Sequence, residues 1–164
     1  MSGDLILLSV VSWLHLVATV VWLGAMVTNI LVLVPTAREV LEPQVMGRFL
    51  GSFMKRFRPI VYVSITALTI TGGIMTLLNK LYLGAFAIGN LWTQLLVVKH
   101  ILIVILIVGV IYSFEVLAHR IGRLAAAGPS PQLAQLQKLQ VRLSFAGLVT
   151  AMIVLLLTSI ITAM

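Results

Sequence analysis

The sequence predicts an all-α protein, an integral membrane antiparallel four-helix bundle with both termini on the outer side. Hydrophobic residues make up 61% of the 164 residues and charged residues only 9%, with a mean hydropathy of +1.18. A soluble domain carries about 25% charged residues. Apolar runs long enough to cross a bilayer also recur four times, separated by basic segments. A bundle with short loops uses this whole length, so we expect a single transmembrane domain, 1–164.

The first two predicted helices differ in composition. The first spans about residues 5–34, which carry no charge, and ends at Pro35. The second spans about residues 59–78, directly after the basic run 55–58. It carries hydroxyl residues and glycines, namely Ser64, Thr66, Thr69, Thr71, Gly72 and Gly73. Such residues let helices approach closely and hydrogen-bond inside a bundle.

The third predicted helix spans about residues 91–114 and contains Lys99 and His100. The fourth spans about residues 143–163 and has few polar side chains. Just before it, segment 131–141 places leucines among glutamines. This pattern predicts an amphipathic helix that lies on the membrane surface.

The charges predict the topology. Most basic residues lie in the predicted loops 36–58 and 115–142: Arg38, Arg48, Lys55, Arg56 and Arg58 in the first, and Arg120, Arg123, Lys138 and Arg142 in the second. The segment between the second and third helices offers only Lys80. By the positive-inside rule both basic loops are cytoplasmic, in a cell (inner) membrane, and the termini face outward. The net charge of +7 is therefore interpreted as a topology signal, and nucleic acid is not an expected partner.

The chemistry-bearing residues are few. There is no cysteine, which excludes disulfides and thiolate metal sites. The chain also shows no nucleophile paired with a base, no pair of intramembrane carboxylates and no glycine-rich phosphate loop. Hydrolases and nucleotide-driven transporters are therefore poor hypotheses. An enzymatic activity, if there is one, would be that of an oxidoreductase, quinol-linked or otherwise.

Two histidines lie inside predicted spans. His15 is ten residues into the first helix and His100 nine residues into the third, so the rise of the helix places them about 15 Å and about 13–14 Å below the outer end. Both helices run inward, and in a bundle a flat cofactor fits between them. This predicts a bis-histidine haem b, while a simple hydrogen bond to a neighbouring helix stays open for each ring. His119 lies beyond the third helix and is interpreted as a solvated residue.

Further residues are predicted to surround the cofactor. Trp22 and Asn29 follow His15 at steps of seven, on one stripe of the first helix, and Gly24 beside it would admit a ring edge. Lys99 points about 100° away from its neighbour His100. Pairing with a haem propionate is the preferred role of Lys99, and snorkelling outward or ligation as a neutral amine are its alternatives.

Short strings in three helices resemble known families. They are Trp13-Leu14-His15 and Trp22-Leu23-Gly24 in the first helix, Arg56-Phe57-Arg58-Pro59 and Thr71-Gly72-Gly73 in the second, and Trp92 with Lys99 in the third. Over about residues 10–100 they are similar to the CopD-like and HemJ-like families of small four-helix membrane proteins. The resemblance implies either a copper-uptake protein or a haem-binding protoporphyrinogen oxidase. It also implies a ligand role for His15 and a functional role for Lys99.

Three functional hypotheses follow. The first is a haem b membrane cytochrome that carries electrons in a redox chain, with His15 and His100 as axial ligands and a quinol or another redox subunit as partner. The second is a CopD-type copper transport or resistance protein that uses His15, Met26 and, as an open alternative, His100. Met26 and Met75 are the methionines that could be soft copper ligands, while filling gaps in the core is the preferred role of both. The third is a cofactor-free accessory subunit of a larger membrane complex. All three place the chain in the lipid bilayer, and each is compatible with a homo-oligomer.

Overall fold

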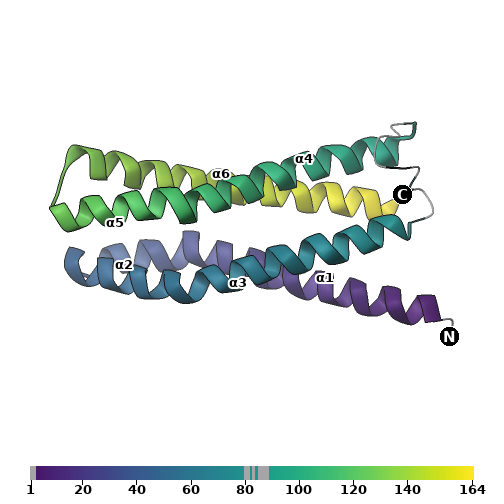
Figure 1. Cartoon of the computed structure of the whole chain (residues 1–164), viewed down its shortest axis with the longest axis horizontal. Coiled ribbons are helices and arrows are strands. Elements are labelled where there is room, and N and C mark those ends of the chain that lie inside the picture. The colour runs from purple at the N-terminus through teal and green to yellow at the C-terminus, as the bar shows by residue number, and fades with distance from the viewer. Residues whose placement is uncertain (1–2, 80–81, 83, 85–88) are drawn as a thin grey trace. The chain divides into compact units, whose positions relative to one another are not determined.

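The computed structural model describes residues 3–79, 82, 84 and 89–164, and every regular element among them is a helix (Figure 1). The predicted all-α class is therefore confirmed. Four helical stretches are long and apolar enough to cross a membrane, namely 5–40, 45–77, 91–127 and 131–163. The chain divides into two compact units, 1–84 and 85–164, and each is a helical hairpin. Lys80 lies outside the described residues.

The first unit pairs a long interrupted helix with a long continuous one. Helix α1 (Gly3–Thr28) leads through a π-helical turn, Asn29–Leu33, into α2 (Val34–Val40), and α3 (Pro43–Leu77) returns antiparallel to α1. Extended backbone at Leu41 ends α2, and a proline at the first position of α3 suits a helix start because its ring presets φ. The buried side chains of this unit are Val11, Ala18, Ala37, Phe57, Val61, Ser64 and Thr71.

The prediction that the first helix ends at Pro35 is wrong. The chain stays helical to Val40 because the π-helical turn lies just before the proline, and Val34 N–H donates to the Asn29 carbonyl five residues back. Proline has no N–H, and in a regular helix its ring clashes with the carbonyl four residues earlier. Pro35 directly follows the start of α2, and the wider π turn before it gives the ring room.

The predicted start of the second helix at residue 59 is also wrong. Helix α3 begins sixteen residues earlier, at Pro43, and contains both the basic run 55–58 and Pro59. Lys and Arg are good helix formers, so a basic run does not end a helix. It marks the level at which a spanning helix leaves the apolar part of the membrane.

The second unit repeats this plan. Helix α4 (Leu91–Ile111) leads through a π-helical turn, Tyr112–Leu117, into α5 (Ala118–Ala127), and α6 (Pro131–Ala163) returns along them. Asn90 caps α4, since its Oδ1 accepts from Thr93 N–H at 2.7 Å, and Ser130 caps α6 by accepting from Leu133 N–H at 3.2 Å. The turn between α5 and α6 uses Gly128 at φ +108°, a conformation that favours glycine.

Two further predictions need correction in this unit. The third helix does not end near residue 114 but continues to Ala127. Segment 131–141 is the first third of α6 and not a separate surface helix, because no glycine or proline interrupts the chain between Pro131 and Leu143. Of the two predicted loops, 36–58 and 115–142, only short turns such as 128–130 are non-helical.

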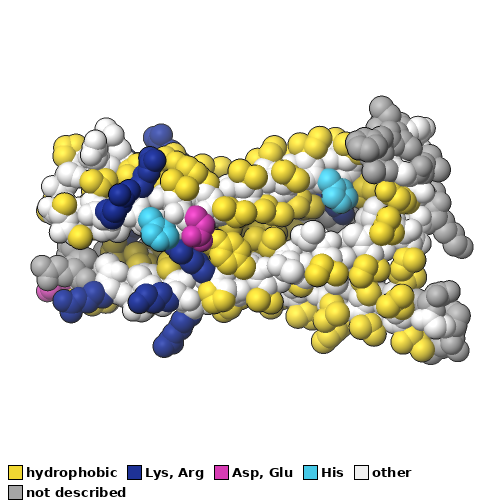
Figure 2. Space-filling view, viewed as in Figure 1, with side chains coloured by type: hydrophobic (Ala, Val, Ile, Leu, Met, Phe, Trp, Pro, Cys, Tyr) yellow, Lys and Arg dark blue, Asp and Glu magenta, His cyan; other side chains and the backbone are white. Residues whose placement is uncertain are grey.

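The helices are longer than a membrane is thick. Spans of 33 to 37 residues measure about 50–55 Å at 1.5 Å per residue, against about 30 Å for the hydrocarbon core of a bilayer. In each unit the Lys and Arg side chains gather toward the end where the short turn joins its helices (Figure 2). Elsewhere large apolar side chains lie exposed, with Val20 at 70% and Val63 at 69%. Such surfaces suit lipid and not water.

Candidate functional site

His15 lies on α1 and is held by a buried threonine of α3. The His15 Nδ1 atom is 2.7 Å from Thr71 Oγ1, and Thr71 Oγ1 donates to the Ala67 carbonyl at 2.6 Å. A hydroxyl has one hydrogen, and a carbonyl oxygen only accepts, so the Thr71 hydroxyl donates its hydrogen to the Ala67 carbonyl. In the hydrogen bond with His15, the Thr71 oxygen must therefore accept, and the N–H of the His15 ring is on Nδ1. In the neutral ring the lone pair is on Nε2.

Gly72, next to this threonine, lies directly against the His15 ring. A Cβ added at Gly72 would lie 3.3 Å from His15 Cε1, closer than an ordinary van der Waals contact, whereas a Cβ at Gly73 would meet nothing within 4 Å. The imidazole therefore packs directly on the Gly72 backbone. Of the two glycines, Gly72 is the one that lies against His15, and an added methyl group there would require the ring to shift by a few tenths of an ångström.

His100, on α4, has the same hydrogen-bond pattern with a different acceptor. Its Nδ1 is 2.7 Å from the Leu96 carbonyl one turn earlier. Since a carbonyl oxygen only accepts, Nδ1 carries the hydrogen and the lone pair of the neutral ring is on Nε2. The side chain lies on the exposed surface of α4.

Each histidine lies at a similar depth in its own hairpin. Thr71, which holds His15, follows Arg58, the last basic residue of α3, by 13 residues. His100 precedes Glu115, the first charged residue after it, by 15 residues. At 1.5 Å per residue these separations are about 20 Å and about 22 Å. Both rings thus lie well inside the apolar length of their helices.

Comparison with family models, curated proteins and solved structures finds no match for this chain. Two residues that lie against His15, Thr71 and Gly72, were not predicted as its partners. The Thr-Gly-Gly string was the only signal for them in the sequence, and it marked close helix packing without naming what would pack there.

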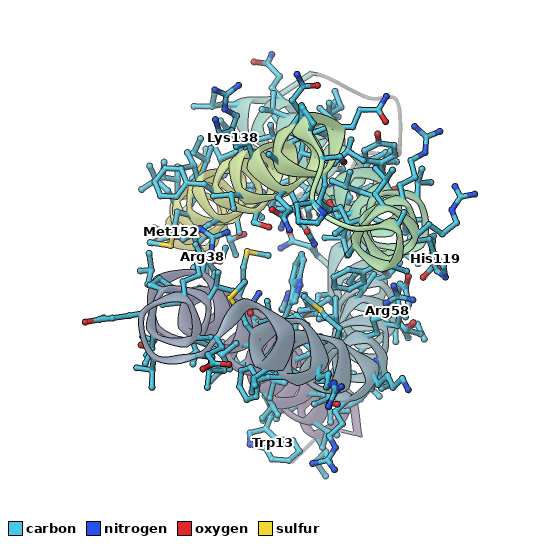
Figure 3. The ribbon with its side chains drawn as sticks, turned by 90° about the vertical axis from the view of Figure 1, so that its left-hand side faces the viewer. Trp13, Arg38, Arg58, His119, Lys138 and Met152 are labelled. Carbon is cyan, nitrogen blue, oxygen red and sulfur yellow. The ribbon has the colours of Figure 1, made fainter. Side chains whose placement is uncertain are left out.

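The remaining predicted residues of the first unit lie further along α1 and in the π-helical turn that follows it. Trp22 is partly buried on α1, and a Cβ at Gly24 would meet nothing within 4 Å, so no contact there requires glycine. Asn29 opens the π-helical turn, and its Oδ1 is buried with no hydrogen bond from a described residue. An unsatisfied buried acceptor costs about 1–3 kcal/mol. Trp13, by contrast, points outward from α1, with 62% of its surface exposed (Figure 3).

In the second unit Lys99 is partly exposed on α4, and its pairing with a propionate stays a prediction. His119 is exposed on α5 (Figure 3), as expected for a solvated residue.

The donor atoms for a metal ion are scattered over the described residues. No group of three His, Cys, Asp or Glu side chains comes together among them. Met26 follows His15 by 11 residues within α1, which separates their backbones by about 16 Å. Met75 is partly buried on α3, where packing is the more ordinary role of methionine.

An apolar groove runs along the contact between α1 and α3. Its volume is about 590 Å³, and Ala18, Ser64, Ala67 and Thr71 form part of its lining. Small residues leave this space, and His15 is not among the lining residues. In a bilayer such an open apolar groove suits an acyl chain, and it adjoins the histidine through Thr71, which both lines the groove and holds His15.

Proposed function

We propose that this protein is a haem b-binding membrane cytochrome that carries single electrons in a membrane redox chain, with His15 and His100 as axial ligands. One observation supports this most. Each ring has its Nδ1 2.7 Å from an oxygen of its own hairpin, an arrangement in which Nδ1 carries the hydrogen and the Nε2 of a neutral ring would carry the lone pair. Histidines that ligate metals typically donate their other ring N–H in this way, which fixes the tautomer and orients the ring.

The donor set fits haem better than a metal ion held by protein alone. A porphyrin supplies four nitrogen ligands, so the protein needs only one neutral imidazole on each face of the iron. His15 and His100 would be these two ligands. Bound haem would supply one-electron redox chemistry. The chain would hold it, orient both imidazoles, and exclude water with apolar side chains.

The proposal includes an antiparallel four-helix bundle in the inner membrane, with the short turns of both hairpins in the cytoplasm and both termini outside. The basic residues on either side of each turn support this orientation. Electron-exchange partners would be a quinol or another redox subunit in the same membrane.

Cysteine labelling tests the orientation directly, because the chain has no cysteine of its own. We expect a membrane-impermeant maleimide added to intact spheroplasts to label Gly89→Cys. Glu42→Cys and Pro129→Cys, at the two short turns, should react only after the membrane is permeabilised. Labelling of the two turn variants before permeabilisation, with Gly89→Cys protected, would show the opposite orientation.

The functional proposal is tested first on the unmodified protein. Purified from cells with ample haem, it should show a Soret band and sharp α and β bands in the reduced-minus-oxidised absorption spectrum, as low-spin bis-histidine haem b does. A colourless protein would reject the cytochrome proposal. Copper analysis would then test the CopD-type hypothesis, and a protein with neither cofactor would favour the accessory-subunit hypothesis.

A further inference from the structure

The basic end of the second hairpin contains a pocket that the histidines do not use. It lies between α5 and the first turns of α6, with a volume of about 530 Å³. Its lining consists of two arginines and a leucine from α5 and two glutamines and a leucine from α6: Arg120, Arg123, Leu124, Gln132, Gln135 and Leu136. The lining thus combines N–H donors with two leucines.

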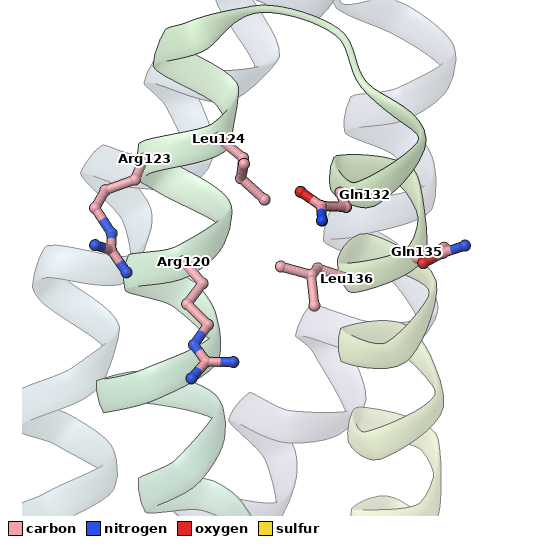
Figure 4. A pocket seen from close by; sticks show the side chains of 6 residues that line it. All are labelled: Arg120, Arg123, Leu124, Gln132, Gln135 and Leu136. Atoms are coloured by element: carbon pink, nitrogen blue, oxygen red, sulfur yellow. The ribbon is translucent and has the colours of Figure 1, made fainter.

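The close view shows how these side chains are arranged (Figure 4). Leu124 and Leu136 point toward each other across the gap, and the Gln132 amide also points into it. Arg120 extends along the side of the gap, while Arg123 points away from α6, at the rim. An incoming group would therefore meet Arg120 and Gln132 first, and the flexible Arg123 side chain could turn toward it.

The charge of the pocket selects an anion. No acidic side chain lines it, and Glu115 is the only acidic residue between positions 85 and 164. Guanidinium groups have N–H donors in a planar fork that matches the oxygens of a phosphate, and a glutamine amide adds neutral donors. The two leucines suit the apolar part of a ligand that carries such a group.

The level of the pocket suits the headgroup layer of a membrane. Arg120 follows Glu115 by five residues, which is about 7–8 Å along a helix. The headgroup region extends roughly 5–8 Å beyond the hydrocarbon core on each side. If the apolar length of α4 spans the core, Arg120 and Gln132 lie where lipid phosphates are densest.

We propose that the pocket between α5 and α6 binds the phosphate group of an anion, with Arg120 and Gln132 in direct contact and Arg123 closing the rim. The same chemistry is offered by an anionic phospholipid such as phosphatidylglycerol and by free phosphate. The level of the pocket and its two leucines favour the lipid. This proposal does not depend on haem.

The test is native mass spectrometry of the full chain in detergent, titrated with phosphatidylglycerol, with phosphatidylcholine, or with inorganic phosphate. The Arg120→Gln/Arg123→Gln variant should bind phosphatidylglycerol about tenfold more weakly, because it loses two charge-assisted contacts. The Lys138→Gln/Arg142→Gln variant removes the same charge from the same hairpin but outside the pocket, and should change binding less than about twofold. Gln132→Leu, which leaves the charge unchanged, should weaken binding about threefold.

The outcomes distinguish phosphate binding in this pocket from general electrostatic attraction to the basic end of the hairpin. Equal losses in the two double variants, with no effect of Gln132→Leu, would overturn the proposal, and so would equal binding of phosphatidylglycerol and phosphatidylcholine. Binding of inorganic phosphate that Arg120→Gln/Arg123→Gln abolishes would support the pocket and assign it to free phosphate. Lipid binding without phosphate binding would support it and assign it to the membrane.

Discussion

Replacing either His15 or His100 by alanine is expected to abolish the low-spin haem b spectrum. Each proposed ligand supplies one of the two imidazoles that keep the iron six-coordinate and low-spin. With one imidazole lost, the iron should become five-coordinate and high-spin or the haem should dissociate. The measurement is the reduced-minus-oxidised spectrum of each purified variant, with haem content determined separately.

His119→Ala is the matched control, since His119 is an exposed histidine on α5. It should leave both the α band and the haem content unchanged. An unchanged low-spin spectrum in His15→Ala or His100→Ala, with full haem content, would exclude that residue as an axial ligand. A loss caused by His119→Ala instead would move the site to the basic end of the second hairpin.

The apolar spans could be predicted from the sequence, but the helix ends could not. Length and hydropathy located four membrane-crossing segments, and the structure has a helix at each of them. The predicted ends were placed at Pro35 and at the basic run before Pro59, yet both lie inside helical stretches. Hydropathy reports the thickness of the membrane, whereas a helix ends only where its backbone hydrogen bonding is interrupted.

The histidines could be predicted as candidates, because an ionisable ring in a membrane span is costly. The hydrogen-bond acceptors of the two rings could not be predicted. The second helix offers five serine and threonine side chains, and nothing in their spacing singles out Thr71 as the partner of a residue 56 positions away. That choice depends on the register in which α1 packs against α3. For His100 the acceptor is local, a backbone carbonyl one turn away, but backbone carbonyls are present at every position.

The pattern of donors also connects the fold with the proposed chemistry. In the first hairpin two neighbouring residues of α3 hold His15: the Thr71 hydroxyl bonds its ring, and the ring packs on Gly72. In the second hairpin the backbone alone orients His100. The orientation of His15 is therefore the one that a side-chain substitution can disturb without touching the ligand itself.

Thr71→Val is expected to weaken haem binding about 10- to 100-fold, the range typical for losing a residue that orients a metal ligand. Valine keeps the shape of threonine but cannot accept the His15 N–H. An unsatisfied buried donor costs about 1–3 kcal/mol, and the ring is no longer fixed with Nε2 toward its ligand position. The measurement is a titration of the haem-free protein with haem, together with the midpoint potential of the bound haem, because losing this acceptor also makes the imidazole a weaker donor to iron.

Two variants on the same helix separate this effect from general damage to α3. Thr69→Val removes a hydroxyl that donates to the Ile65 carbonyl at 2.8 Å, the same type of local bond that Thr71 makes with Ala67, but on an exposed position that holds no histidine. It should leave haem affinity and midpoint potential unchanged. Thr71→Ser retains the hydroxyl and should bind haem nearly as tightly as the unmodified protein. If Thr69→Val weakens binding as much as Thr71→Val, or if Thr71→Ser fails to restore it, the hydroxyl of Thr71 does not orient His15 for ligation, and His15 would have to be held by its packing on Gly72 alone.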